Sequence, residues 1–202
     1  VGLYGLKPSP DRLEEQHLRS TEAIFARAAA IDNEQGAEPA VLSTERAPQD
    51  RVVSICRDFA LVETALLRAT GVPARVRCGF ANYFERGRWT DHWITERWDD
   101  GRWVRDDPQI DALQRSTFGL DFDPHDQPPG HFLDASQAWI GARAGTYDAS
   151  RFGIFDMWGL TYIAGNVLAD IACLAKTEML PWDGWGVGLT FGPFDDLPAD
   201  LL

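Results

Sequence analysis

A cysteine stands where the sequence predicts the start of a helix. Cys56 is followed by apolar residues at helical spacing, and Gly71 and Pro73 mark the end of that helix. A helix N-terminus carries partial positive charge and unpaired backbone N–H groups, which favour a thiolate and can hold an oxyanion. Cys56 is therefore a candidate nucleophile.

A histidine and an aspartate follow the cysteine on two predicted strands. His92 lies within the first strand, 88–98, and Asp107 directly follows the second, 102–106, across an Asp-Asp-Gly turn. Neighbouring antiparallel strands lie about 5 Å apart, so cross-strand side chains can touch. His92 would take the thiol proton and later protonate the leaving group, while Asp107 would orient the imidazole. The order of the three residues predicts a thiol acyl-transfer enzyme.

Each of these residues also has a structural interpretation. A cysteine on an apolar helix is usually a small buried hydrophobic residue, and an aspartate before Pro108 is a common turn former. A single histidine on a strand is commonly half-buried. Asp106 is an alternative third member, but strand alternation places it on the side opposite Asp107. The ordered combination favours the catalytic interpretation.

The surrounding pattern predicts an α+β fold, with helices packed on one face of an antiparallel sheet. No repeat or long linker divides the chain, so a single domain over residues 1–202 is expected. The predicted helices cover 9–32, 56–70, 134–144, and a stretch from about 156 or 160 to 176. The predicted strands cover 74–84, 88–98 and 102–106, and the predicted loops cover 33–50, with a short element at 41–42, 118–133, and the tail from 181.

The composition limits the classes of partner. Formal net charge is -12, which argues against nucleic acid or an anionic membrane surface as partner. The sequence shows no signal peptide and no run of about 18 apolar residues. Its odd number of cysteines does not suggest a disulfide framework, so a cytoplasmic protein is expected. No histidine has a partner at metal-ligand spacing, and no metal site is predicted.

Four further residues are candidates for binding a substrate. Arg75 could bind a carboxylate, although an ion pair with one of the many acidic residues is the alternative. Tyr83 and Trp93 could border a groove, with core packing as the alternative. Asn166 follows Gly165 within a predicted helix that neither residue favours, and this conflict indicates either function or a close helix contact.

Several motifs between residue 51 and about residue 110 resemble the core of the transglutaminase-like superfamily. They are Cys56-Arg57-Asp58-Phe59-Ala60, the run from Leu67 to Val76, Gly79-Phe80, Asp91-His92-Trp93 and Trp103-Val104-Arg105-Asp106-Asp107-Pro108. Three later stretches resemble a bacterial subgroup of the same superfamily: Arg151 to Asp156, Gly165-Asn166 and Leu180 to Asp183.

The resemblance implies a papain-like fold, with a helical extension over about 132–202. It implies a catalytic triad of Cys56, His92 and Asp107 that acts through a thioester, with no cofactor. Members of the superfamily often place a glutamine or an aromatic residue in the oxyanion hole before the cysteine. Gln49, seven residues ahead of Cys56, has the right type, although polar loops commonly hold such a residue.

We therefore expect a soluble, cytoplasmic Cys-His-Asp enzyme. Its reaction would be acyl transfer, or hydrolysis of an amide or thioester, on a small-molecule, peptide or carrier-bound acyl substrate. An amine is a possible acceptor. The alternatives are a cysteine peptidase and a non-catalytic module that binds a peptide.

Overall fold

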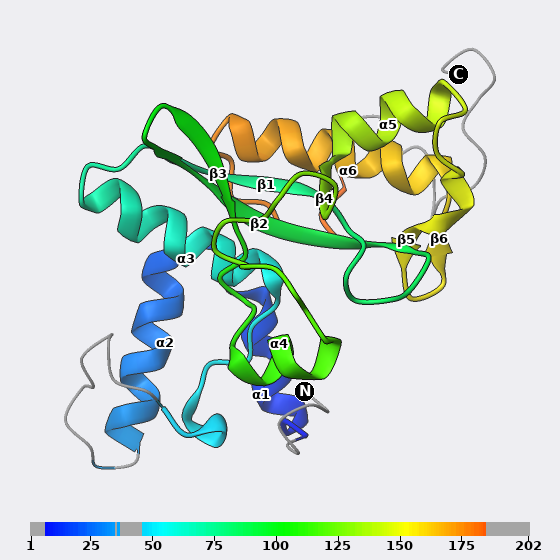
Figure 1. The fold of residues 1–202 in the computed structure, drawn as a ribbon. Helices are drawn as coiled ribbons and strands as arrows, with labels where there is room; N and C mark the ends of the chain where they lie inside the picture. Colours follow the sequence, from blue (N-terminus) through cyan, green and yellow to red (C-terminus); the bar gives the residue numbers. More distant parts are fainter. Residues whose placement is uncertain (1–6, 35, 37–45, 185–202) are drawn as a thin grey trace.

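The computed structural model describes residues 7–34, 36 and 46–184. A six-stranded sheet has the order β4-β1-β2-β5-β6, with β3 also paired to β2 (Figure 1). The strands are β1 (Ala74–Ala81), β2 (Trp89–Asp99), β3 (Arg102–Asp106), β4 (Phe132–Asp134), β5 (Phe152–Ile154) and β6 (Met157–Trp158). The α-helices are α1 (Pro10–Leu13), α2 (Thr21–Glu34), α3 (Cys56–Ala69), α4 (Ala112–Phe118), α5 (Ala135–Arg143) and α6 (Leu160–Leu174). The predicted α+β class is confirmed.

The first three strands form the predicted antiparallel meander. β1 pairs with β2 along its whole length, with Gly79 opposite His92, and β2 continues into β3 through a tight hairpin. Asp100 and Gly101 in that hairpin have φ angles of 43° and 82°. Positive φ at both central residues is what a two-residue type I′ turn requires. β1 ends at residue 81 rather than at the predicted 84.

Three short strands, β4, β5 and β6, extend the predicted sheet. β4 pairs antiparallel with the end of β1, whereas β5 pairs parallel with the start of β2, so the sheet is mixed at that edge. The close approach of β4 depends on Gly79. A Cβ at that position would collide with the backbone of Leu133 and Asp134 and with the ring of Phe132.

The edge of β2 that faces away from β1 carries two partner strands. β3 covers residues 95–99 and β5 covers residues 89–90. Among the described strands, none pairs with residues 91–94 on this edge. His92 lies in this gap, so its surroundings can be formed by segments other than strands.

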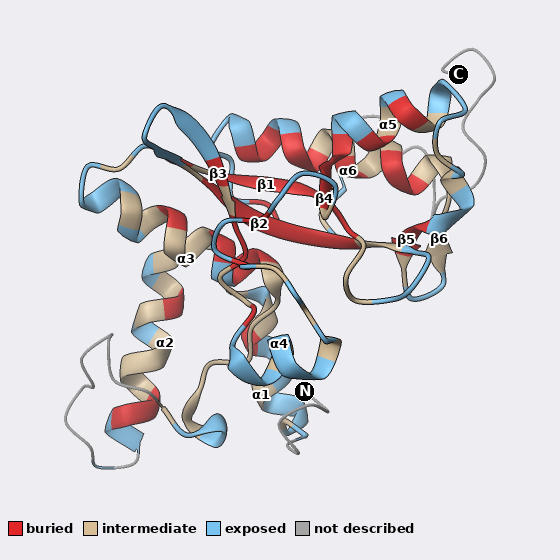
Figure 2. Ribbon diagram, in the orientation of Figure 1, coloured by how far each residue is buried: buried red, intermediate tan, exposed pale blue. Residues whose placement is uncertain are grey.

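The core lies between the sheet and the helices α3, α5 and α6. Figure 2 shows the buried residues concentrated along β1 and β2 and on parts of these helices. One apolar cluster joins α3, α6 and the two central strands through Ala60, Val76, Cys78, Trp93, Ala169 and Cys173. A second cluster joins β1 and β5 to α5 and α6. Helices α3 and α6 therefore pack against one shared set of side chains from β1 and β2.

The helix predicted over 9–32 is interrupted. α1 and a 3-10 turn, η2 (Glu14–His17), end before Leu18, whose backbone is extended, and α2 begins at Thr21. The Ser20 hydroxyl accepts a hydrogen bond from the Ala23 N–H (3.1 Å), so a local side-chain contact restarts the helix. The continuous periodicity of the sequence did not reveal this break. The short element expected at 41–42 lies outside the described residues.

The other helices follow the sequence closely. α3 and α5 begin and end within a residue or two of their predicted limits, and α6 ends two residues early. α4 was not predicted, although its signals are present: the Asp111 carboxylate caps it and Gly119 ends it with a φ of 64°. None of the described helices is long and apolar enough to cross a membrane.

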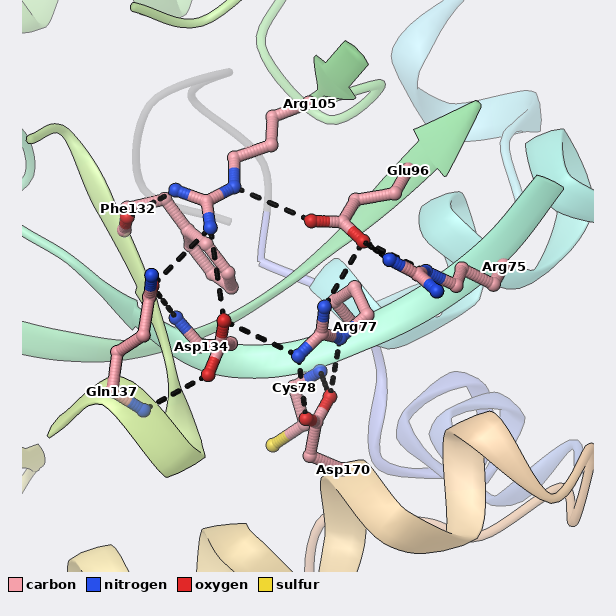
Figure 3. A network of polar contacts seen from close by, with 9 residues as sticks. All are labelled: Arg75, Arg77, Cys78, Glu96, Arg105, Phe132, Asp134, Gln137 and Asp170. Carbon is pink, nitrogen blue, oxygen red and sulfur yellow. Dashed lines mark hydrogen bonds and ion pairs between the residues drawn. The ribbon is translucent and has the colours of Figure 1, made fainter. Parts of the chain in front are cut away.

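A network of charged side chains joins the sheet to α5 and α6 (Figure 3). Arg77 of β1 is at its centre and contacts Asp170 (2.8 and 2.9 Å), Glu96 (3.0 Å) and Asp134 (3.3 Å). Burial opposes the charge of Arg77, but these carboxylates raise its pKa above the ordinary value. The network is completed by Arg75, Arg105 and Gln137. Each carboxylate has an arginine partner, so the network fixes the helices to the sheet.

Candidate active site

Cys56 is the first residue of α3, as predicted. The preceding residue, Ile55, is extended (φ −114°, ψ 173°), and its N–H donates to the Asp58 carboxylate (2.9 Å). The buried guanidinium of Arg57 donates to the carbonyls of Leu18, Arg19 and Met179 and pairs with Asp58. The two charged residues after Cys56 therefore hold the start of the helix in place, while Cys56 itself is only partly buried.

His92 and Asp107 are in direct contact. The His92 Nε2 atom lies 2.7 Å from Asp107 Oδ2, and the two residues are 2% and 0% exposed. The other carboxylate oxygen accepts the Gln109 N–H (3.1 Å), and the Asp107 N–H donates to the Pro124 carbonyl (2.8 Å). The aspartate is therefore held at both its backbone and its side chain.

The thiol of Cys56 lies close enough to the His92 imidazole to raise the pKa of the ring. Burial opposes a charge on His92, but Asp107, by its charge and its hydrogen bond, and then Cys56 together raise the pKa of His92 to about 10. The surroundings therefore favour an imidazolium beside the sulfur.

Asp106, the alternative third member, faces other residues. Its carboxylate accepts from His125 Nδ1 (2.8 Å) and from Arg97 Nε (3.3 Å). Thr95 is its partner across β2 and β3, and the Thr95 hydroxyl donates to the backbone of α3. The alternation of the strand thus separates Asp106 from His92, as expected from the sequence.

Tyr83 lies behind the aspartate. Its hydroxyl donates to Asp107 Oδ2 (2.6 Å), the same oxygen that contacts His92, and accepts from Gln127 Nε2 (3.2 Å). Burial and then the Asp107 charge raise the pKa of Tyr83 well above its ordinary value, so the phenol keeps its proton and acts as donor. The sequence predicts that Tyr83 borders a groove or packs in the core, and its hydroxyl lies at Asp107. Nothing in the 118–133 sequence distinguishes Gln127.

Aromatic rings surround the imidazole on this side. The ring centroid of Phe84 is 4.7 Å from that of His92, and Phe118 of α4 lies 5.3 Å from Phe84. Phe122 contacts Tyr83 (5.5 Å) and stacks on His131 (4.1 Å). α4 and the loop after it thus bring apolar rings to the site, which lowers its local dielectric and strengthens the contact between His92 and Asp107.

The other predicted substrate-binding residues lie in different surroundings. Arg75 pairs with Glu96 (2.7 Å) and stacks over Trp103 (4.0 Å). Trp93 is 2% exposed and belongs to the core cluster against which Cys56 packs. Gln49 is exposed in the 3-10 turn η3 (Pro48–Asp50), where its amide contacts the Asp50 carboxylate (3.5 Å). Core packing and ion pairing, the alternatives stated for Trp93 and Arg75, thus describe what these residues contact.

Asn166 reaches a carboxylate next to His92. Its side-chain amide donates to Asp91 Oδ1 (3.1 Å), and the Tyr162 hydroxyl donates to Asp91 Oδ2 (2.6 Å). Asn166, which has a low helix propensity, therefore makes a close contact from within α6 to the sheet. Over the described residues, no group of three or more His, Cys, Asp or Glu side chains is arranged to hold a metal ion.

Comparisons with known proteins identify one family. Residues 11–108 match the family model of the transglutaminase-like superfamily. A structural search matches a crystal structure of a "putative cysteine protease" from Cytophaga hutchinsonii, with 19% sequence identity and a TM-score of 0.28. The match covers 65% of this chain and 50% of that protein. No curated protein matches the chain.

Proposed function

Residues 11–108 belong to the transglutaminase-like superfamily, and from this we propose that Cys56, His92 and Asp107 form the catalytic triad of a thiol-dependent acyl-transfer enzyme. The observation that carries the proposal is the 2.7 Å contact of His92 with Asp107, with the Cys56 thiol as the other neighbour of the imidazole. The α+β architecture, a helix that starts at the cysteine and packs against the sheet, is that of a papain-like core.

In the first half-reaction, the proton of the Cys56 thiol is held by His92 as an imidazolium. The thiolate attacks the acyl carbon, and a C–S bond forms while the carbonyl π electrons move onto oxygen. The backbone N–H of Cys56, which has no acceptor within the helix, can hold that oxyanion. The bond to the leaving group then breaks, the imidazolium gives its proton to that group, and a thioester remains.

In the second half-reaction, a water or an amine attacks the thioester. His92 removes the proton of the attacking group, and the C–S bond breaks to regenerate the thiol. Asp107 stabilises the imidazolium in both halves, and Tyr83 with Gln127 holds Asp107 in place. Water gives hydrolysis and an amine gives transfer. A small-molecule, peptide or carrier-bound acyl group fits this chemistry, and a peptidase would be its special case.

The direct test is to trap the acyl-enzyme. The protein is incubated with a panel of acyl donors (p-nitrophenyl esters, acyl thioesters and peptide amides) and its intact mass is measured. We expect an added acyl mass on the wild type and none on Cys56→Ala. Asp107→Asn should slow acylation at least a hundredfold, whereas the neighbouring Asp106→Asn should change it less than threefold.

Failure of the proposal has a clear form. If Cys56 reacts with iodoacetamide at neutral pH no faster than a thiol in the unfolded chain, the thiol is not activated. A non-catalytic, peptide-binding module would then explain the fold. If acylation occurs, adding an amine separates the two reactions, because only a transferase incorporates the amine into the product.

A further inference from the structure

Asp91 carries a buried carboxylate whose hydrogen-bond partners are both uncharged. It is 8% exposed, and its two oxygens accept from the phenol of Tyr162 (2.6 Å) and the amide of Asn166 (3.1 Å). Burial, its largest influence, raises the pKa of Asp91. Neutral donors only partly offset the cost of burying a negative charge.

The other buried carboxylates of the described residues have partners that can carry a positive charge. Each of them lies within 4 Å of an arginine or a histidine nitrogen. They are Glu15, Asp32, Asp58, Glu96, Asp106, Asp107, Asp134 and Asp170. The cation that acts on Asp91 is the imidazolium of His92, which is already hydrogen-bonded to Asp107. Within the described part of the chain, Asp91 is thus a buried carboxylate without a contacting cation of its own.

The register of α3 on β2 places Asp91 beyond the end of the helix that bears the thiol. The Thr95 hydroxyl donates to the carbonyl of Ala60 (3.1 Å), and Cys56 is one helical turn, about 6 Å, before Ala60. Cys56 accordingly packs against the apolar cluster that contains Trp93, which lies two residues before Thr95. Asp91 is two residues further on the same face, about 7 Å along the strand. An acyl group attacked by the sulfur must approach from this end of the helix.

We propose that Asp91, with Tyr162 and Asn166 of α6, forms a subsite for a cationic group of the substrate, an ammonium or a guanidinium close to the acyl carbon. The inference rests on the proposed function, since it assigns a substrate class to the same thiol. A cation bound there would give Asp91 the charged partner that it lacks among the described residues. The formal net charge of -12 adds a weaker, long-range attraction for the same substrates.

The test compares how fast Cys56 reacts with thiol reagents that differ in charge. Three methanethiosulfonates are used, with 2-aminoethyl, 2-hydroxyethyl and 2-sulfonatoethyl groups. The thiolate attacks the sulfenyl sulfur, a mixed disulfide forms and methanesulfinate leaves. Each rate at pH 7 is divided by the rate of the same reagent with 2-mercaptoethanol. The ratio of the cationic to the neutral reagent then reports the field at Cys56, because thiolate content and access cancel.

In the wild type, we expect the cationic reagent to be favoured about tenfold over the neutral reagent, and the anionic reagent to be disfavoured. Asp91→Asn should reduce both preferences to less than twofold. Asp106→Asn removes the same charge from a buried carboxylate that faces away from His92, and its ratios should stay within twofold of the wild type. Asn166→Asp, which adds a second carboxylate at the subsite, should raise the cation preference further.

Two outcomes would overturn the inference. If Asp91→Asn keeps the cation preference, the charge of Asp91 does not act on the substrate. If Asp91→Asn does not fold, the Asn166→Asp variant decides. If its ratio of cationic to neutral reagent rates equals that of the wild type, a charge at this position does not act on the substrate. In either case, Cys56 that still reacts fast with the neutral reagent leaves the proposed function intact. If Cys56 reacts slowly with all three reagents, the proposed function fails, and the subsite fails with it.

Discussion

Removing the charge of Asp107 is the most informative single perturbation. In the native site, the pKa of His92 is raised from 6.5 to about 10, although burial alone opposes the imidazolium. The difference corresponds to about 5 kcal/mol in favour of the charged ring. Asp107→Asn removes the charge of the partner while keeping its size. Burial still lowers the pKa of His92 in this variant, but the Asp107 charge that raised it is gone. We therefore expect the pKa of His92 in the variant to fall to 6.5 or lower.

The assay is a pH titration of His92 by long-range proton–nitrogen NMR, together with the pH profile of Cys56 alkylation. At pH 8, the ring should be an imidazolium in the wild type and neutral in Asp107→Asn. The Asp106→Asn variant is the control, and its His92 should titrate as in the wild type. The reasoning is refuted if His92 of the wild type is neutral at pH 8, or if Asp107→Asn still titrates above about pH 9.

The same shift has a consequence for stability, with a defined sign. The pKa of His92 is higher in the folded state than in the unfolded chain, so the ring stabilises the fold fully below about pH 6.5. This contribution is lost as the pH rises through about 10. The difference in unfolding free energy between the wild type and Asp107→Asn should therefore be about 3–5 kcal/mol at pH 6 and should shrink toward pH 10.

Three further predictions concern residues around the site. Tyr83→Phe removes a donor from the carboxylate that holds His92, so the alkaline limit of activity should rise by about half to one pH unit, and an unchanged pH profile would contradict this. Arg77→Met removes the arginine partner of the buried Asp170 and one of the partners of Glu96 and Asp134, and it should cost about 3 kcal/mol in urea unfolding, against at most about 1 kcal/mol for the more exposed Arg75→Met. Burial raises the pKa of Glu63 to about 7, so the folded state loses stability as the pH rises from about 4.5 to 7. Glu63→Gln should raise the unfolding free energy by about 1–2 kcal/mol at pH 8 and by little at pH 4, and equal effects at both pH values would exclude this reasoning.

Local patterns predicted the parts of the fold that local physics decides. The apolar spacing after Cys56, the Asp-Asp-Gly turn and the Asp134 cap are each complete within a few residues, and α3, the β2–β3 hairpin and α5 follow them. The separation of Asp106 from Asp107 follows from the period of a strand. The strands β4, β5 and β6 are two or three residues long and are stabilised by pairing with distant segments. No local pattern could reveal them.

The candidate site divides in the same way. The residue types and their order along the chain indicated Cys56, His92 and Asp107. The contact of Tyr83 with Asp107 brings together residues that are 24 positions apart, and the partners of Asp91 lie 71 and 75 positions away. Such contacts depend on how the loop 118–131 and α6 are folded against the sheet. That information resides in the tertiary structure.

The network of charged side chains around Arg77 also affects how readily two copies of the chain associate through a strand edge. β4 covers β1 only at residues 79–81, so the first part of β1 has an edge without a partner strand among the described residues. Exposed strand edges promote association between chains. Here the Cys78 N–H on that edge donates to the Asp170 carboxylate (3.0 Å), while the guanidinium groups of Arg75 and Arg77 lie alongside. A hydrogen-bonding position on the edge is thus occupied and the approach is charged, which protects the sheet against edge-to-edge aggregation.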